Sequence, residues 1–151
     1  MNTERFSPWV RWADRNKLQH LNFPGVYALA ISKYGISGKP FSWIKEVVYV
    51  GMTNAARGLR GRFEQFNDTV VGRRTVHGGA ERFLHDYPRE QDLVPFLYVA
   101  VAPFKCSVTS IRHDDLITMG DVAKAEYECF AQYTDRFGTL PHYNDKKNAP
   151  K

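Results

Sequence analysis

The sequence predicts a single domain of the α/β class, more specifically α+β, in which helices flank a small antiparallel sheet. Apolar runs typical of strands occur at Val26 to Ser32, at Glu46 to Val50 and at Leu93 to Val101. The segments between and after them carry apolar residues at helical spacing. A chain of 151 residues suits one hydrophobic core, so we expect residues 1–151 to form one domain.

The first 22 residues are predicted to form a helical extension. Ser7 is a favoured helix cap, and Pro8 fits the first helical position. An apolar face could come from Trp9, Val10, Trp12 and Leu18. Pro24 and Gly25 would end the helix, because neither continues it well.

The first two predicted strands form an antiparallel hairpin. The segment between them, Lys33 to Trp43, is rich in Gly, Ser and Pro, which is typical of a loop. Helices are predicted at Gly58 to Phe66 and at Gly79 to His85. The third strand lies between Pro88 and Pro103.

The last helix is the clearest helical element in the chain. Its apolar residues recur at helical spacing from Met119 to Phe137, and Gly138 supplies a stop before Pro141. Residues 145–151 are polar, and we expect them to form a frayed tail.

The net charge of +5 favours a polyanionic partner such as nucleic acid. The arginines crowd into one third of the chain, at Arg57, Arg60, Arg62, Arg73, Arg74 and Arg82. A solvated helical surface would explain any single one of them equally well. With two cysteines and no long apolar segment, the sequence indicates a reduced cytoplasmic protein that does not contact a membrane.

Glu126 is a carboxylate on the apolar side of the last helix. At about 100° per residue, Val122, Phe130 and other apolar residues fall within about 40° of Glu126 on the helical wheel. Glu128 projects to the other side and is expected to face water. A buried carboxylate needs a partner. Glu126 is therefore either a functional carboxylate or one half of a structural salt bridge to a buried arginine.

Arg62 is the arginine nearest the apolar face of its own helix. Leu59, Phe63 and Phe66 define that face, whereas Arg60 lies about 90° to the other side and Arg57 points away. A guanidinium that reaches over the sheet could hold a phosphate with two hydrogen bonds. Pairing with Glu126 for stability alone is the other interpretation.

Two aromatic tripeptides stand in the hairpin, Gly25-Val26-Tyr27 and Tyr49-Val50-Gly51. Each joins a tyrosine to a glycine that permits close approach, and the basic segment from Gly58 to Phe63 follows the second one. Two phenols with nearby arginines suggest phosphodiester chemistry. Aromatic packing across the hairpin is the alternative for both tyrosines.

With these residues in this order, the chain resembles the GIY-YIG nuclease superfamily. The tripeptides match the two namesake motifs, Arg62 follows Leu59 as the pattern's arginine does, and Glu126 matches its glutamate. The closing Pro-x-aromatic-Asn falls on Pro141 to Asn144, so that the resemblance covers most of the chain.

The resemblance implies a sandwich with a central three-stranded antiparallel sheet and a metal-dependent endonuclease that acts on DNA. A single Mg²⁺ or Mn²⁺ ion would be held by Glu126. Tyr27 or Tyr49 would handle the attacking water and Arg62 would clamp the phosphate. Asn144 would support either the site or its own turn. The motif glycines are Gly25 and Gly51, and zinc is not expected because the cysteines and histidines lack ligand spacing.

The chain departs from the family pattern at Met52, where many members carry a lysine, and at Phe66, where they carry a tyrosine or histidine. His77 is a candidate replacement for a proton relay, with an ordinary loop histidine as the alternative. A catalytically inactive nucleic-acid-binding module is therefore the second hypothesis, and RNA is not excluded as a substrate.

Five arginines are predicted to contact nucleic acid, namely Arg57, Arg60, Arg73, Arg74 and Arg82. Recognition loops would lie at Lys33 to Trp43 and at Asn67 to Tyr87. One site per chain would require a homodimer or two successive nicks to cut both strands, and a guiding protein partner is also conceivable.

Overall fold

A four-stranded antiparallel sheet forms the centre of the computed structural model, which describes residues 1–73 and 77–145. The strand order is β1-β4-β2-β3. The strands are β1 (Val10–Arg11), β2 (Gly25–Ile31), β3 (Val47–Thr53) and β4 (Leu97–Pro103). This architecture confirms the predicted mixed α+β class, but the sheet has four strands rather than three because two residues of the N-terminal segment pair with β4.

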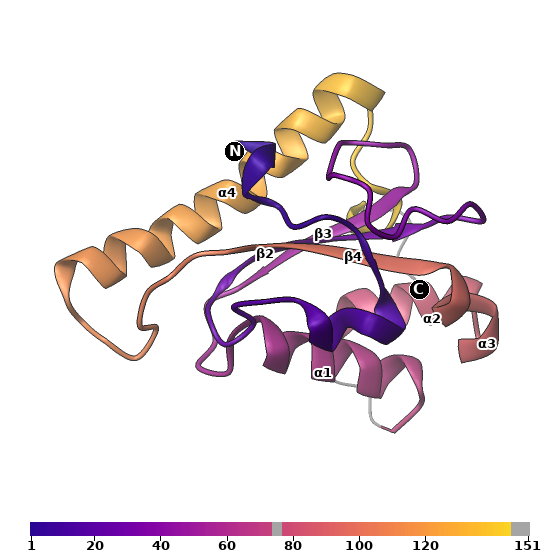
Figure 1. The fold of residues 1–151 in the computed structure, drawn as a ribbon, viewed down its shortest axis with the longest axis horizontal. Coiled ribbons are helices and arrows are strands. Elements are labelled where there is room, and N and C mark those ends of the chain that lie inside the picture. Colours follow the sequence, from indigo (N-terminus) through magenta and orange to yellow (C-terminus); the bar gives the residue numbers. More distant parts are fainter. Residues whose placement is uncertain (74–76, 146–151) are drawn as a thin grey trace.

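Helices cover both faces of the sheet (Figure 1). The long helix α4 (His113–Phe137) lies on one side, and α1 (Gly58–Val70) and α2 (Gly78–Asp86) lie on the other. The short helix α3 (Glu90–Leu93) precedes β4. Four short 3-10 helices complete the described elements, at Thr3–Arg5, Trp12–Lys17, Val94–Phe96 and His142–Asn144.

The central strand β2 contributes side chains to two hydrophobic cores, because alternate side chains of a strand point to opposite faces. Val26, Ala28 and Ala30 join the core beneath α4. Tyr27 and Leu29 join the core beneath α1 and α2. Since helices cover both faces, six of the seven residues of β2 are buried, and Tyr27 is directed toward α1 and α2.

The predicted helix after Ser7 is wrong. The Ser7 amide donates to the Val101 carbonyl at 2.7 Å, and the Ser7 hydroxyl accepts from the Val101 amide at 3.0 Å. These bonds hold the segment along β4, so it becomes the edge strand β1 followed by the 3-10 helix Trp12–Lys17. Hydrogen bonding to β4 therefore outweighed the local preference of Ser7 to cap a helix.

The predicted strand from Leu93 to Val101 starts four residues later, at Leu97. Pro95 lies in the first turn of the 3-10 helix Val94–Phe96. A proline has a fixed φ and no amide donor, which suits the start of a helical turn better than the inside of a sheet.

The last helix ends as predicted but begins earlier than its apolar pattern. Gly138 adopts a left-handed φ of 78°, and its amide bonds to the Thr134 carbonyl, which satisfies the end of α4. Glu128 was expected to face water, and its side chain is 36% exposed. It forms an ion pair with the N-terminal ammonium group of Met1, and a second, longer one with Lys124 at 3.7 Å.

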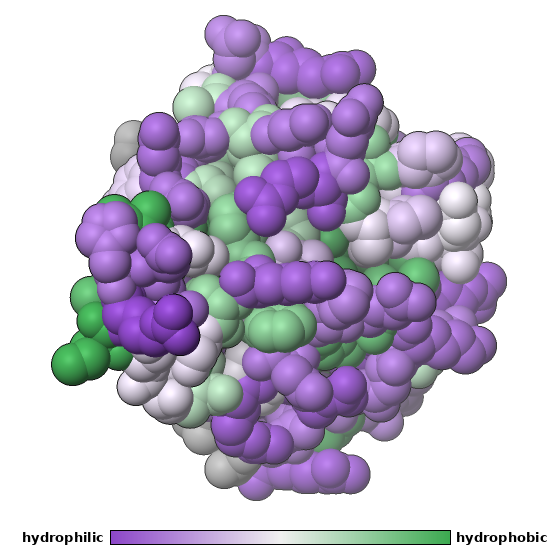
Figure 2. Space-filling view, turned by 60° about the vertical axis from the view of Figure 1, so that its left-hand side comes forward, coloured by the Kyte–Doolittle hydropathy of each residue, from purple (hydrophilic) through white to green (hydrophobic). Residues whose placement is uncertain are grey.

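No helix among residues 1–73 and 77–145 is long and apolar enough to cross a membrane. Hydrophilic side chains cover most of the face in Figure 2, and apolar side chains gather at its left edge. Large apolar groups near the start of α4 are exposed in the single chain, namely Ile111, Leu116 and Ile117.

Candidate active site

The two motif tyrosines share the face of the sheet that α1 and α2 cover. Tyr27 lies opposite Gly51 in the β2–β3 register, and Tyr49 lies opposite Leu29. Their ring centroids are 6.1 Å apart. A Cβ atom at Gly51 would come within 2.5 Å of the Tyr27 hydroxyl oxygen, so glycine is needed there to let the Tyr27 ring lie across β3.

The two phenols differ in their access to solvent. Tyr27 is 1% exposed and Tyr49 is 9% exposed, so Tyr49 is the one nearer to the surface. Burial raises the pKa of both hydroxyl groups above the usual value for tyrosine, and the charge of Arg62 opposes this rise in each case. Both phenols are therefore neutral near pH 7.

His77 lies against Tyr27 and caps helix α2. Its Nε2 atom is 3.1 Å from the Tyr27 hydroxyl, and its Nδ1 atom accepts the Ala80 amide at 3.2 Å. The side chain is only 1% exposed. Burial, together with the charge of Arg62, lowers the pKa of His77 to about 3, so the imidazole is neutral at physiological pH.

Arg62 reaches the cluster from α1. Its Nη1 atom donates to Gln65 at 3.0 Å, and its Nε atom is buried without a hydrogen-bond partner among the described residues. Its charge lowers the pKa of the Tyr27 hydroxyl. The residue lines a cleft of about 420 Å³ that also includes Met52 and Arg57. Its charge influences the pKa of both tyrosines, which makes it the common electrostatic neighbour of the two phenols.

Glu126 approaches the same place from α4. It is half-buried, at the border of the helix face formed by Val122, Ala125 and Cys129. Burial raises the pKa of its carboxyl group, and the nearby charge of Arg62 lowers it. Within the described part of the chain, however, Glu126 and Arg62 make no direct ion pair. The structural salt bridge considered as an alternative is thus not formed.

Asn144 anchors the edge strand between the motif residues. Its Oδ1 atom accepts the Val50 amide at 2.8 Å, and its Nδ2 atom donates to the Val50 carbonyl at 2.8 Å. The side-chain amide thus replaces a neighbouring strand at the exposed edge of β3. Its role in this structure is to fix the strand that carries Tyr49 and Gly51.

The other arginines that were predicted to contact nucleic acid have different partners in the structure. Arg57 forms an ion pair with Glu64 at the rim of the cleft, and Arg73 pairs with Asp68 on the surface. Arg82 donates to the Tyr143 carbonyl at 2.7 Å and so holds the C-terminal segment. Arg74 lies outside the described residues.

Arg60 faces away from the tyrosines. It contacts Asn22 and Asn16 at 3.4 and 3.5 Å, so its side chain lies along the N-terminal segment rather than over the cleft. This placement agrees with the helical register that separated Arg60 from Arg62.

Three residues of the cluster escaped the sequence reasoning. Gln65 binds Arg62, Thr69 accepts the His77 amide at 3.2 Å, and Gly79 makes room for Tyr49. A Cβ atom at Gly79 would lie 2.8 Å from the Tyr49 hydroxyl oxygen. The pair Gly78-Gly79 after a histidine was the available signal, since adjacent glycines often mark close packing.

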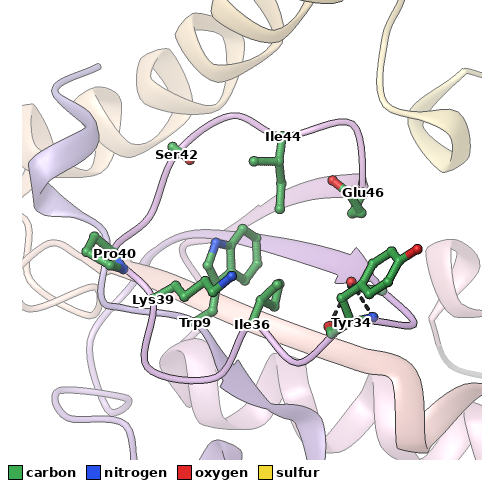
Figure 3. Close-up of a pocket in the computed structure, with 9 residues that line it drawn as sticks. Trp9, Tyr34, Ile36, Lys39, Pro40, Ser42, Ile44 and Glu46 are labelled. Atoms are coloured by element: carbon green, nitrogen blue, oxygen red, sulfur yellow. Dashed lines mark hydrogen bonds between the residues drawn. The ribbon is translucent and has the colours of Figure 1, made fainter.

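The proposed recognition segments have different structures. Residues 33–46 form a loop that borders a second concavity of about 340 Å³ (Figure 3). Trp9 lies within it near Lys39 and Ile36, whereas the ring of Tyr34 points away. The described part of the second segment, Asn67 to Tyr87, is largely helical and belongs to α1 and α2. None of the predicted catalytic residues lines the concavity in Figure 3.

The donor set fits a weakly held hard cation rather than a metal cage. Glu126 offers a carboxylate, which suits Mg²⁺ or Mn²⁺ that retain water and substrate ligands. The described residues contain no group of three or more His, Cys, Asp or Glu side chains that could hold a metal ion. No protein-family model, curated protein or solved structure matches this chain.

Proposed function

We propose that the chain is a metal-dependent endonuclease that hydrolyses phosphodiester bonds in DNA, with one active site per chain. The observation that carries this proposal is the arrangement of Arg62 and Glu126. They lie on helices that cover opposite faces of the sheet, and the charges of both act on Tyr49, although they form no direct ion pair with each other in the described part of the chain. Opposite charges held apart suit a phosphate and its counter-ion, and Arg62 lines the cleft of about 420 Å³.

Tyr49 is the better candidate for contacting the attacking water. It is nearer to solvent than Tyr27, and the charges of Arg62 and Glu126 both influence its pKa. An unperturbed phenol is only about 0.1 per cent ionised at pH 7, and burial reduces that fraction further. Tyr49 would therefore orient the water through its neutral hydroxyl, whose oxygen accepts a hydrogen bond from the attacking water.

Arg62 would hold the non-bridging phosphate oxygens. A guanidinium presents parallel donors that match this geometry, and its charge offsets the negative charge that increases in the transition state. Glu126 would hold the divalent ion. When bound, such an ion supplies Lewis-acid stabilisation of the leaving oxygen.

The first test is cleavage of supercoiled plasmid DNA with Mg²⁺ or Mn²⁺. Wild-type protein should nick the plasmid, and Glu126→Gln should reduce the rate at least about 100-fold because the anionic ligand is lost. Glu128→Gln is the matched control, since that residue lies on the same helix but pairs with the N-terminus. Incubation with RNA of the same sequence under the same conditions tests whether the protein cleaves DNA or RNA.

The second candidate function is a binding module without catalysis. Met52 lines the cleft where a general acid would be useful, and this observation favours it. Phe66 does not, because its buried ring packs on His77 with centroids 5.2 Å apart and thus has a structural role. DNA binding that is equal in wild type and Glu126→Gln, with no cleavage in either metal, would establish this second function instead.

A further inference from the structure

A third concavity, of about 350 Å³, lies between the N-terminal segment and the end of β4, and we call it the N-terminal concavity. Arg5, Lys17 and His20 contribute to its lining. No acidic residue lines it. Val101 and Pro103 of β4 form part of its wall. Since it offers three nitrogen donors and no carboxylate, it favours an anionic ligand.

The N-terminal concavity lies at the same end of the sheet as the cleft that Arg62 lines. Gly25, the first residue of β2, pairs with Thr53 of β3 on one side and with Pro103 of β4 on the other. Thr53 lines the cleft, and Pro103 lines the N-terminal concavity. These two lining residues are therefore separated by two strand spacings, or about 10 Å.

Two of the donors are held in place by the protein itself. The guanidinium of Arg5 lies 3.7 Å from the centroid of the Phe104 ring, and its Nη2 atom is 3.5 Å from the Pro103 carbonyl oxygen. His20 has a φ of 62°, and no other non-glycine residue among 1–73 and 77–145 has a positive φ. Such a backbone conformation is uncommon outside glycine and recurs at ligand sites.

The segment that carries Lys17 and His20 is fixed against the start of α1. The Arg60 amide donates to the Leu21 carbonyl at 2.8 Å. Gly58 lines the cleft, and a Cβ atom there would lie 2.5 Å from the carbonyl oxygen of Asn22. Residues 21 and 22 therefore join the wall of the cleft directly to the segment that forms the N-terminal concavity.

We propose that the N-terminal concavity binds a backbone phosphate of DNA other than the one that is cleaved. The grooves of B-DNA are about 6 and 12 Å wide, so one duplex can present phosphates at separations near the two strand spacings, about 10 Å, between the sites. Such a contact positions the duplex without reading its sequence. The inference rests on the proposed function for the identity of the polyanion, but DNA binding is measured without cleavage.

Lys17→Gln tests the site in a side chain that is 78% exposed, so the fold should not change. In EDTA, which prevents metal-dependent cleavage, fluorescence anisotropy should show weaker binding of a DNA duplex. The slope of log affinity against log salt should decrease in magnitude by about 0.9, the value for one lost phosphate contact.

Arg89→Gln is the matched control. Lys17 pairs with Asp14 and Arg89 pairs with Asp92, each three residues away and each with an exposed cation, so both variants lose one charge and one surface ion pair. Arg89 precedes α3, away from the N-terminal concavity, and its loss should leave the slope unchanged. An unchanged slope in Lys17→Gln, or an equal decrease in both variants, would overturn the proposal.

Amide chemical shifts distinguish a DNA backbone from a free anion. Addition of a short duplex should move the amide signals of residues 17–20 in wild type, and much less in Arg5→Gln. Signals that move with inorganic phosphate but not with the duplex would contradict the assignment to DNA.

The two proposals fail in different ways. If the protein cleaves DNA, Lys17→Gln should raise KM about fivefold and leave kcat near that of wild type, because Lys17 does not contact the cleaved phosphate. A fall in kcat at unchanged KM would overturn this role. DNA binding by wild type without cleavage in Mg²⁺ or Mn²⁺ would refute the nuclease function alone, whereas cleavage with an unchanged salt slope in Lys17→Gln would refute this inference alone.

Discussion

At the scale of single residues, the placement of Arg62 distinguishes this cluster from ordinary packing. The helical wheel separated Arg62 from its charged neighbours, and the structure places it beside both phenols, with Arg60 turned toward Asn16 and Asn22. For His77, the sequence left open whether it is part of the site or an ordinary loop histidine. In the structure it is buried, and both ring nitrogens make hydrogen bonds.

Arg62→Ala should reduce DNA cleavage about 100- to 1,000-fold, because the phosphate loses its positioned cation. Arg60→Ala removes only long contacts to two asparagines and should stay within about threefold of wild type. Single-turnover cleavage rates measure both effects. Similar losses in the two variants would show that the assignment of the phosphate clamp to Arg62 is wrong.

The buried His77 should make the protein less stable in mild acid. Burial lowers the pKa of folded His77 to about 3, whereas the unfolded chain titrates near pH 6.5. Between these values the unfolded chain binds a proton that the folded chain does not. The free energy of unfolding should therefore fall by about 2 kcal/mol from about pH 7 to about pH 5 on account of this group.

Urea denaturation of wild type and His77→Asn across this range measures that contribution. The variant should lose the part of the pH slope that His77 supplies, although its stability near pH 7 will also be lower. Parallel pH profiles for the two proteins would mean that His77 takes up its proton in the folded state as readily as in the unfolded chain.

At the scale of elements, the edge strand β3 is the part on which the site depends most. It carries Tyr49 and Gly51, and its outer edge is closed at Val50 by the side chain of Asn144. A strand edge without such a partner exposes its amide and carbonyl groups. The 3-10 helix His142–Asn144 thus holds in place, through Asn144, the strand that carries Tyr49.

Asn144→Ala should destabilise the protein by about 1–3 kcal/mol, because both polar groups of the buried Val50 lose their partner. It should also slow cleavage by releasing β3 beneath Tyr49. Asn67→Ala is the control, since it removes one hydrogen bond to Trp12 and leaves the contacts of β3 in place. Denaturant midpoints and cleavage rates should separate them: both variants lose stability, but only Asn144→Ala loses activity.

At the scale of the whole molecule, the described arginines that were expected to bind nucleic acid do not form one continuous track. Arg57 and Arg73 are exposed but paired with acids, Arg82 holds the C-terminal segment, and Arg60 faces the N-terminal segment. DNA contact would therefore use a few exposed arginines around the cleft. A homodimer and a guiding partner stay predictions for this chain.

Arg73→Gln should weaken DNA binding and reduce the slope of log affinity against log salt by about one, as expected for a lost phosphate contact. The side chain is 73% exposed, so the fold should not change. Lys124→Gln removes a similarly exposed charge from α4 and should leave the slope unchanged. Binding curves at several salt concentrations provide the measurement, and equal slopes for all three proteins would remove Arg73 from the interface.

Much of the fold could be predicted because its signals are local. The apolar run of β2, the apolar spacing of α4 and the stop at Gly138 depend on residues a few positions apart. The N-terminal segment could not be predicted in this way. Ser7 has a strong local capping preference, but its amide and its hydroxyl oxygen both bond to Val101, 94 residues away.

The sequence by itself determined the α+β class and the candidates Tyr27, Tyr49, Arg62 and Glu126, since strand alternation and helix periodicity set the direction of a side chain relative to its own element. Only the tertiary structure decided that Arg62 and Glu126 form no ion pair with each other among the described residues, that Asn144 closes β3, and that Nε2 of His77 contacts the Tyr27 hydroxyl. Each depends on groups brought together from distant parts of the chain. Their distances, burial and hydrogen-bond direction follow from packing, which no local pattern encodes.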